Sequence, residues 1–195
     1  MNRIFCVIGK SGAGKDTLYK EILSRATSDL VPIIPYTTRP KRVNETDGLN
    51  YFFVSEDQMN IFEKNHQIME KRQYSTVQGI WSYFTLKFEL EDNKDYILIT
   101  TLEGLHNIIE QYGSKIVHVV YLYIDDKERL IRCINRESQQ ASPDYLEVCR
   151  RFIADQEDFS EEHMKQFEHI HYINTGEELE KCLVQWNKIY ERKCE

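Results

Sequence analysis

Residues 9–17 read Gly9-Lys10-Ser11-Gly12-Ala13-Gly14-Lys15-Asp16-Thr17. They follow a short apolar run, Ile4 to Ile8, which predicts a buried strand because it is too short for a helix and rich in strand formers. Leu18, Ile22 and Leu23 then recur at helical spacing. The spacing G-x-x-x-x-G-K between a strand and a helix is the Walker A pattern, which indicates a phosphate-binding loop.

The chemistry of this loop explains its residue types. Glycines let several backbone N–H groups converge on phosphate oxygens, and the helix N-terminus adds partial positive charge. Lys15 supplies a mobile cation for the β- and γ-phosphates of ATP, so we expect it to be catalytic. A plain glycine turn with a chance lysine is the alternative, and the coincidence of strand, spacing, lysine and helix disfavours it. The expected ATP contacts are Gly9, Ser11, Gly12, Ala13, Gly14, Lys15, Asp16 and Thr17.

One position of the loop departs from the usual pattern. Ser or Thr normally follows the lysine, and its hydroxyl ligates Mg²⁺. Here Asp16 takes that place, followed by Thr17. A carboxylate is a competent ligand for a hard cation, so we expect Asp16 to hold the Mg²⁺ that accompanies ATP. The alternative is an acidic residue at a helix start, favoured by the helix dipole.

Composition limits the function classes. The 195 residues are 41% hydrophobic, which argues against a disordered chain. The formal net charge of −7 disfavours a nucleic-acid partner, and no apolar run approaches the ~18 residues of a membrane span. The first residues do not show the longer apolar region and small-residue cleavage site of a secretory signal, so we expect none. An odd number of cysteines without a CxxC pair predicts neither a disulfide framework nor a zinc site, and favours a reducing cytoplasm: Cys6, Cys133, Cys149, Cys182 and Cys194.

Strand and helix patterns alternate along the rest of the chain. Apolar runs at 31–34, 97–99, 117–124 and 170–173 predict further strands. Residues 125–162 and 177–192 read as helical, and 35–55 as loop with short strands, broken by Pro35, Pro40 and Gly48. The closing helix carries Leu179, Leu183 and Trp186 on one side. This alternation predicts an α/β fold with a parallel sheet covered on both faces.

Residues 37–55 read TTRPKRVNETDGLNYFFVS. This segment resembles the T-T-R-x-x-R-x-G-E-x-D-G-x-x-Y-x-F stretch with which the guanylate kinase family binds a nucleoside monophosphate. With the phosphate loop before it and an arginine-rich segment after it, the resemblance covers nearly the whole chain. It implies a single P-loop kinase domain, with a sheet core at 1–34, 87–125 and 163–195, an acceptor-binding insert at 35–86, and a lid at 126–162.

The resemblance assigns the acceptor phosphate to Arg39, Arg42 and Tyr51. Guanidinium groups bind phosphate oxygens in bidentate fashion, and the two arginines are three residues apart. The tyrosine hydroxyl adds a donor. Solvated surface charge is the alternative for either arginine.

Two further elements bear on the acceptor's base. Ile68-Met69-Glu70 resembles the family's I/L-x-E element, whose glutamate reads guanine. An ionised carboxylate only accepts hydrogen bonds, and guanine offers donors at N1 and N2 where adenine has an acceptor at N1. Residues 79–85 resemble the family's G-N-Y-Y-G-T/S if one residue is inserted, which places Tyr83 on phosphate and Thr85 on the base. An aromatic hairpin packed on itself is the alternative.

Other positions depart from the family. Pro35 lies where the family usually has serine. Thr101 lies at the position of the second acid in the family's D-x-D-x-Q-G strand end. We still expect Thr101 to be an acceptor-binding position. We expect Asp16 to replace some of the lost negative charge near the metal. The same Lys-Asp pair occurs in ribose bisphosphate phosphokinases of related fold.

Residues 128–136 resemble the family's lid entry and residues 149–152 its exit. The resemblance implies that Arg136, Arg151 and Arg132 are catalytic, because arginines that arrive with lid closure stabilise the charge on the transferred group. A charged helical hairpin laced by Glu–Arg pairs is the alternative. By the same resemblance, Asn174 lies where the base of ATP rests in the family. Three histidines have a structural or surface role instead: His118, His169 and His171.

The favoured function is ATP-dependent phosphorylation of a nucleoside monophosphate, GMP first, giving ADP and GDP. Two alternatives remain. One is a kinase for another phosphorylated acceptor, such as ribose 1,5-bisphosphate. The other is a non-catalytic guanylate-kinase-like module that binds proteins, which the intact Lys15 and loop glycines disfavour. We expect a cytoplasmic monomer or homodimer with no membrane partner.

Overall fold

The computed structural model describes residues 2–42, 45–76 and 79–191. Val43 and Asn44 of the family-like segment, Arg192 at the end of the expected closing helix, and Cys194 lie outside the described residues. The four described cysteines carry free thiols.

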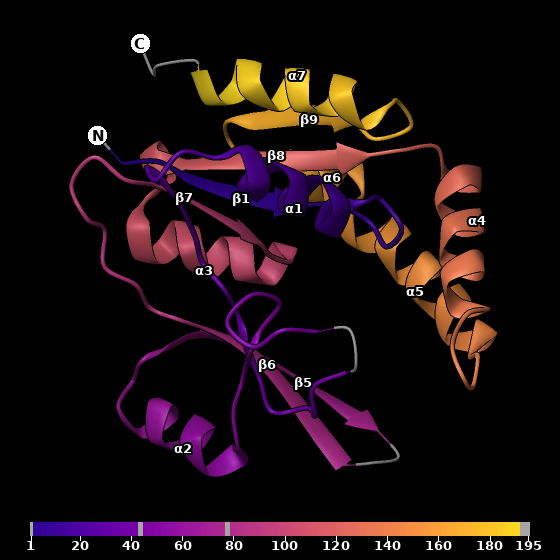
Figure 1. Ribbon diagram of the computed structural model, residues 1–195, viewed down its shortest axis with the longest axis horizontal. Helices are drawn as coiled ribbons and strands as arrows, with labels where there is room; N and C mark the ends of the chain where they lie inside the picture. The colour runs from indigo at the N-terminus through magenta and orange to yellow at the C-terminus, as the bar shows by residue number, and fades with distance from the viewer. Residues whose placement is uncertain (1, 43–44, 77–78, 192–195) are drawn as a thin grey trace.

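A five-stranded parallel sheet forms the centre of the molecule, with strand order β2-β7-β1-β8-β9 (Figure 1). Every residue of the central strand β1 is buried, as expected for a strand covered on both faces. The predicted parallel sheet is confirmed. The strands are β1 (Ile4–Ile8), β2 (Leu30–Pro32), β7 (Asp95–Ile99), β8 (Val117–Tyr123) and β9 (Ile170–Asn174).

The strand predicted at residues 31–34 begins and ends earlier than expected. β2 begins at Leu30 and ends at Pro32, after which the N–H of Ile33 makes a last bond to the carbonyl of Ile97 at 2.9 Å. β2 is an edge strand, and an edge tolerates proline because one side of the strand needs no N–H donor.

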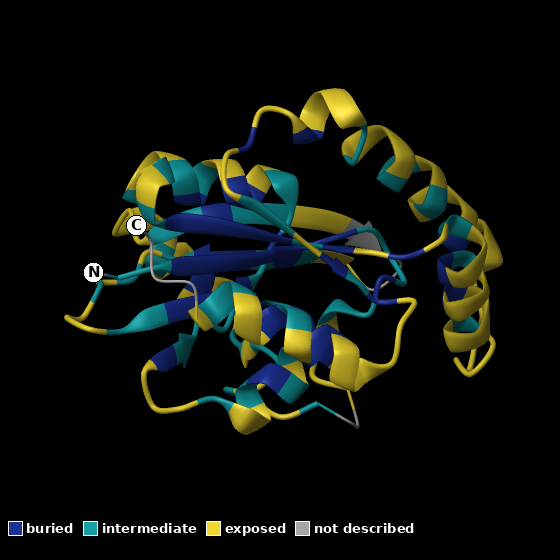
Figure 2. Ribbon diagram, turned by 90° about the horizontal axis from the view of Figure 1, so that it is seen from above, coloured by how far each residue is buried: buried dark blue, intermediate teal, exposed yellow. Residues whose placement is uncertain are grey.

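Alternate residues of β1 face two hydrophobic layers. Phe5 and Val7 pack with α1 (Lys15–Arg25) and α7 (Leu179–Glu191), while Ile4, Cys6 and Ile8 pack against α3 (Leu102–Tyr112) and the segment after α6 (Glu161–Met164). Figure 2 shows the buried strands between helices whose outer faces are exposed. On α7, Leu183 and Trp186 are buried as predicted, and Leu179 is 37% exposed. The short helix η1 (Ser114–Ile116) leads into β8.

A second sheet, of order β4-β3-β6-β5, lies below the core in Figure 1 and falls inside residues 35–86. Its centre is aromatic, with Tyr36 stacked on Phe84 at 5.3 Å between ring centroids. The long β5–β6 hairpin shows that the aromatic hairpin weighed for residues 79–85 exists. The elements are β3 (Tyr36–Thr37), β4 (Phe52–Phe53), α2 (Glu56–Lys64), β5 (Ile68–Thr76) and β6 (Gly79–Leu86).

The charged stretch after residue 125 folds as two main helices, α4 (Asp126–Glu137) and α5 (Tyr145–Asp158). They stand side by side at one end of the sheet (Figure 1). The break falls at a polar segment containing Pro143, which disfavours a helical conformation for the residue before it. Throughout the described part of the chain, each helix is too short or too polar to cross a bilayer.

A histidine cluster lies at the amino-terminal ends of β8 and β9, opposite the edge at which the phosphate loop follows β1. The side chain of His118 is buried, stacks on Phe5 and lies 3.3 Å from His171 between ring nitrogens. Ligands of open parallel sheets bind at the carboxyl ends of strands, so this cluster is remote from the candidate site. Burial, then His171, Arg3 and His169, lower the pKa of His118 from 6.5 to about 4.

We predict that His118 makes the fold acid-sensitive. Because its folded pKa lies below its ordinary value, the unfolded chain binds the extra proton first, so stability is full above pH 6.5, falls as pH drops from 6.5 to 4, and falls no further on this account below 4. The loss reaches at most about 3 kcal/mol. Urea unfolding of wild type and His118→Gln at pH 7, 5.5 and 4 measures it. The variant should lose less stability on acidification, and identical pH curves would contradict the prediction.

Candidate active site

The predicted strand–loop–helix unit is present. β1 ends at Ile8, and α1 begins at Lys15 after Gly14, which caps the helix with a φ of 81°. Gly12 has a φ of 83°, and a Cβ there would lie 2.6 Å from the carbonyl oxygen of Arg129. The glycine is therefore required by backbone conformation and by the close approach of α4. A glycine loop that leads into the N-terminus of a helix is the arrangement that commonly binds phosphate.

The Lys15 ammonium lies inside the loop. Its Nζ donates to the carbonyl oxygens of Gly9 at 2.6 Å and Lys10 at 3.2 Å. Burial lowers the pKa of Lys15. The carboxylates of Asp16 and Asp155 oppose that shift, and Arg136 adds to it. A phosphate anion beside this ammonium would favour its charged form.

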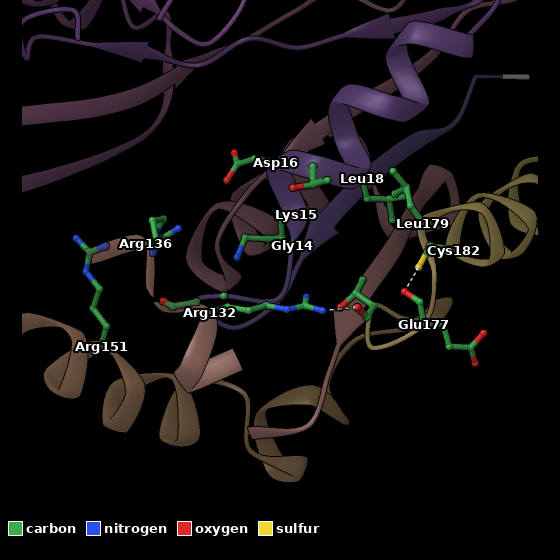
Figure 3. A pocket seen from close by; sticks show the side chains of 14 residues that line it. Gly14, Lys15, Asp16, Leu18, Arg132, Arg136, Arg151, Glu177, Leu179 and Cys182 are labelled. Carbon is green, nitrogen blue, oxygen red and sulfur yellow. Dashed lines mark hydrogen bonds between the residues drawn. The ribbon is translucent and has the colours of Figure 1, made fainter. Parts of the chain in front are cut away.

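An open cleft of about 560 Å³ lies over the loop. Helix α4 contributes Arg132 and Arg136 and helix α5 contributes Arg151, so the cleft gathers Lys15 and all three arginines that were predicted to be catalytic. Figure 3 shows Arg136 and Arg151 together at one edge, with Lys15 between them and α7. The cleft is lined by Ser11, Gly12, Gly14, Lys15, Asp16, Thr17, Leu18, Arg132, Arg136, Arg151, Thr175, Glu177, Leu179 and Cys182.

The lid arginines differ in what holds them. Arg132 donates to the carbonyl of Thr175 at 3.0 Å, which ties α4 to the turn after β9. Arg151 donates to Glu147 one turn away at 2.7 Å. Glu147 also accepts from Arg150, and these hydrogen bonds lower the pKa of Glu147 to about 2. The Glu–Arg lacing weighed as an alternative for the lid is thus present beside the cleft.

Asp16 and Thr17 supply hard oxygen donors at the mouth of the loop. Both are exposed in the first turn of α1 and line the cleft beside Lys15. Mg²⁺ is usually held by one or two carboxylates, waters and substrate phosphates rather than by an all-protein cage. This donor set fits Mg²⁺ bound together with a nucleotide.

The expected acceptor-phosphate residues are only partly brought together. Arg39 is 3% exposed; its Nε donates to the hydroxyl of Tyr83 at 3.1 Å, and its guanidinium lies 5.3 Å from the ring centre of Tyr51. Glu45 accepts from both terminal nitrogens of Arg39 and raises its pKa. Arg42 is exposed, and among the described residues its side chain makes no hydrogen bond, while its backbone N–H donates to Glu45 at 2.9 Å.

The expected base-reading residues meet across the hairpin. Glu70 on β5 is 4% exposed and accepts from the hydroxyl of Thr85 on β6 at 2.9 Å. Arg72, which the sequence analysis missed, donates to Glu70 from Nε at 3.1 Å. The spacing of Arg72 from Glu70 could have identified it, because residues two apart on a strand share a face. A Cβ on Gly104 would lie 3.6 Å from the Glu70 carboxyl carbon, so α3 starts against this pair.

Four expected contacts take other positions. The hydroxyl of Thr101 accepts the N–H of Gly104 at 3.2 Å and so caps α3. Asn174 lies outside the cleft lining. Its amide oxygen accepts the N–H of Gly176 at 3.0 Å within its own turn. Gly9 and Ala13 lie behind the lining: Gly9 gives its carbonyl to Lys15, and Ala13 is 1% exposed in the core.

The lining residues after β9 were missed by the sequence analysis: Thr175, Glu177, Leu179 and Cys182. They form no recognisable spacing pattern. Their place in the cleft depends on how α7 returns over the sheet.

Comparisons with known proteins identify similar proteins in one family. A family model described as guanylate kinase matches residues 1–192. The chain is 32% identical to a guanylate kinase of Thermotoga maritima, over 67% of this chain and 63% of that protein. It is 28% identical to those of Mycoplasma genitalium, over 96% of this chain and 74% of that protein, and Syntrophomonas wolfei, over 94% and 90%.

A solved structure shows the same fold. The crystal structure of guanylate kinase from Anaplasma phagocytophilum superposes with a TM-score of 0.62 at 18% identity. The superposition covers 97% of this chain and 85% of that one.

Proposed function

The chain belongs to the guanylate kinase family, a family of phosphotransferases, and from this premise we propose that it transfers the γ-phosphoryl group of ATP to GMP, giving ADP and GDP. The observation that carries the proposal is the convergence of Lys15, Arg132, Arg136 and Arg151 on one cleft at the phosphate loop. Phosphoryl transfer needs little covalent chemistry from a protein, and this set of cations supplies positioning and charge stabilisation.

Each part of the site has a role in this reaction. The loop N–H groups and Lys15 bind the ATP phosphates, and Arg136 and Arg151 stabilise charge on the transferred group. Asp16, with Thr17, would hold Mg²⁺, which neutralises charge on the β- and γ-phosphates when bound. On the insert, Arg39 with Tyr51 and Tyr83 binds the acceptor phosphate, supported by their mutual contacts.

The base-reading pair supports a guanine nucleotide over the other acceptors considered. Glu70 offers acceptor oxygens for the N1 and N2 donors of guanine, and Thr85 orients that carboxylate. No observed contact favours ribose 1,5-bisphosphate. The intact Lys15 cradle argues against a purely protein-binding module. Cytoplasmic location, monomer or homodimer, and lack of a nucleic-acid partner stay predictions from the sequence.

Lys15→Ala should lower kcat by about 100- to 1,000-fold, because a cation beside the transferred phosphate is lost. Coupled ADP release is measured with ATP and, in turn, GMP, AMP, UMP and ribose 1,5-bisphosphate. Lys20→Ala, an exposed position on the same helix, is the matched control and should retain wild-type rates. Turnover near wild type in a folded Lys15→Ala protein would contradict a kinase, and a preference for another acceptor would contradict GMP.

Arg39→Ala should raise the KM for GMP about tenfold to 100-fold and leave the KM for ATP nearly unchanged, because a charge-assisted phosphate contact contributes about 1.5–3 kcal/mol. Arg42→Ala should have a smaller effect, since its side chain is exposed. Glu45→Gln weakens the ion pair that holds Arg39 but keeps the Arg39 side chain, so it is the control for a folding defect. Equal changes in both KM values, or a larger effect from Arg42→Ala, would show that Arg39 does not face the acceptor.

Asp16→Asn should raise the Mg²⁺ concentration needed for half-maximal rate at saturating ATP and GMP, because the amide is a weaker ligand than the carboxylate. Asp16→Ser supplies the usual hydroxyl and should keep substantial activity. An unchanged Mg²⁺ midpoint in Asp16→Asn, with only a small drop in melting temperature, would leave Asp16 as a helix-start acid.

A further inference from the structure

Arg129 on α4 is a charged side chain that the proposed reaction does not use. It is 0% exposed, the largest side chain among the fully buried ones described. Its Nε donates to Asp126 at 2.6 Å, one terminal nitrogen donates to Asp155 of α5 at 3.2 Å, and its guanidinium lies 3.8 Å from the ring centre of Phe152. A buried arginine is tolerated only when its charge is paired in this way.

The same Asp155 oxygen reaches the phosphate loop. It accepts the backbone N–H of Ser11 at 2.8 Å, and Arg129 approaches the Ser11 carbonyl at 3.5 Å. The backbone of Arg129 also lies against Gly12 so closely that a Cβ there would come within 2.6 Å of its carbonyl oxygen. The two lid helices therefore hold both polar groups of one loop residue.

This arrangement has an electrostatic consequence. Asp155 places a carboxylate at the edge of a loop that must accept a triphosphate, and like charges at close range in a poorly solvated site repel strongly. Arg129 cancels that charge on its buried side. A neutral amide in place of Asp155 would still accept the Ser11 N–H but would not need the arginine.

We propose that Arg129 and Asp155 are positioning residues for ATP: Asp155 holds the phosphate loop in its binding shape through Ser11, and Arg129 neutralises Asp155 so that the triphosphate is not repelled. The proposal deepens the proposed function, since it concerns the ATP side of the same site. It couples the lid to the loop through an ion pair rather than through contact with substrate.

Binding of ATP without acceptor, measured by titration calorimetry, tests the pair in four proteins: wild type, Arg129→Met, Asp155→Asn and the double variant. Arg129→Met should raise the Kd for ATP about tenfold or more, because it leaves the Asp155 carboxylate near the phosphates without its ion-pair partner. Asp155→Asn should change the Kd only a few-fold. The double variant should bind ATP like Asp155→Asn, so that removing the second charge rescues the first loss.

Steady-state constants add a readout that a general structural role would not move: Arg129→Met should raise the KM for ATP far more than that for GMP. Glu161→Gln, which removes an exposed Glu161–Lys165 pair, is the control and should leave both unchanged. Additive losses in the double variant, or equal rises in both KM values, would overturn the inference.

If Arg129→Met does not fold, the double variant is compared with Asp155→Asn alone. Equal Kd values support the proposal, and a tenfold weaker double variant overturns it. The expected ATP pattern without any GMP phosphorylation would refute the proposed function while leaving this inference standing.

Discussion

The rest of the structure depends on the close approach of the phosphate loop to its neighbours at the carboxyl end of β1. A Cβ on Gly9 would lie 2.6 Å from the carbonyl oxygen of Leu122 on β8, and one on Gly12 would meet α4 equally closely. The backbone of the loop thus fits against the sheet and α4 at once, and the loop residues Ser11, Gly12 and Gly14 line the cleft. The order of strands and the return of α4, α5 and α7 then determine which side chains line that cleft.

The protein concentrates positive charge locally although its net charge is −7. On the proposed ATP side, the hydrogen bonds that Lys15 makes among the described residues go to neutral carbonyl groups of its own loop, and Arg136 lines the open cleft. On the acceptor side, the cations are already paired: Arg39 with Glu45, and Arg72 with Glu70. In the proposed reaction, an incoming acceptor phosphate would meet a guanidinium that already pairs with a carboxylate. Such pairing keeps the arginine rotamer ordered before substrate arrives, which lowers the entropy lost on binding.

Two residues reduce the negative charge of the proposed acceptor site. Thr101, at a position where the resemblance to the family leads us to expect an acid, caps α3, and Arg72 places a cation directly beside Glu70. Glu70 nevertheless keeps its orientation, because Thr85 donates to it from the opposite strand and α3 packs against it. In the proposed function, the reading of guanine therefore depends on one carboxylate that two neighbours hold in place.

The sequence by itself determined the phosphate loop, the parallel sheet and the identity of the family-like segment, because glycine spacing and apolar runs are local consequences of backbone geometry. The meeting of Glu70 with Thr85 followed only from hairpin register, which an inserted residue obscures in the sequence. The burial of Arg129 and the lining residues after β9 were decided by tertiary structure alone. Each depends on which helix returns against which loop, and such long-range contacts leave no fixed spacing along the chain.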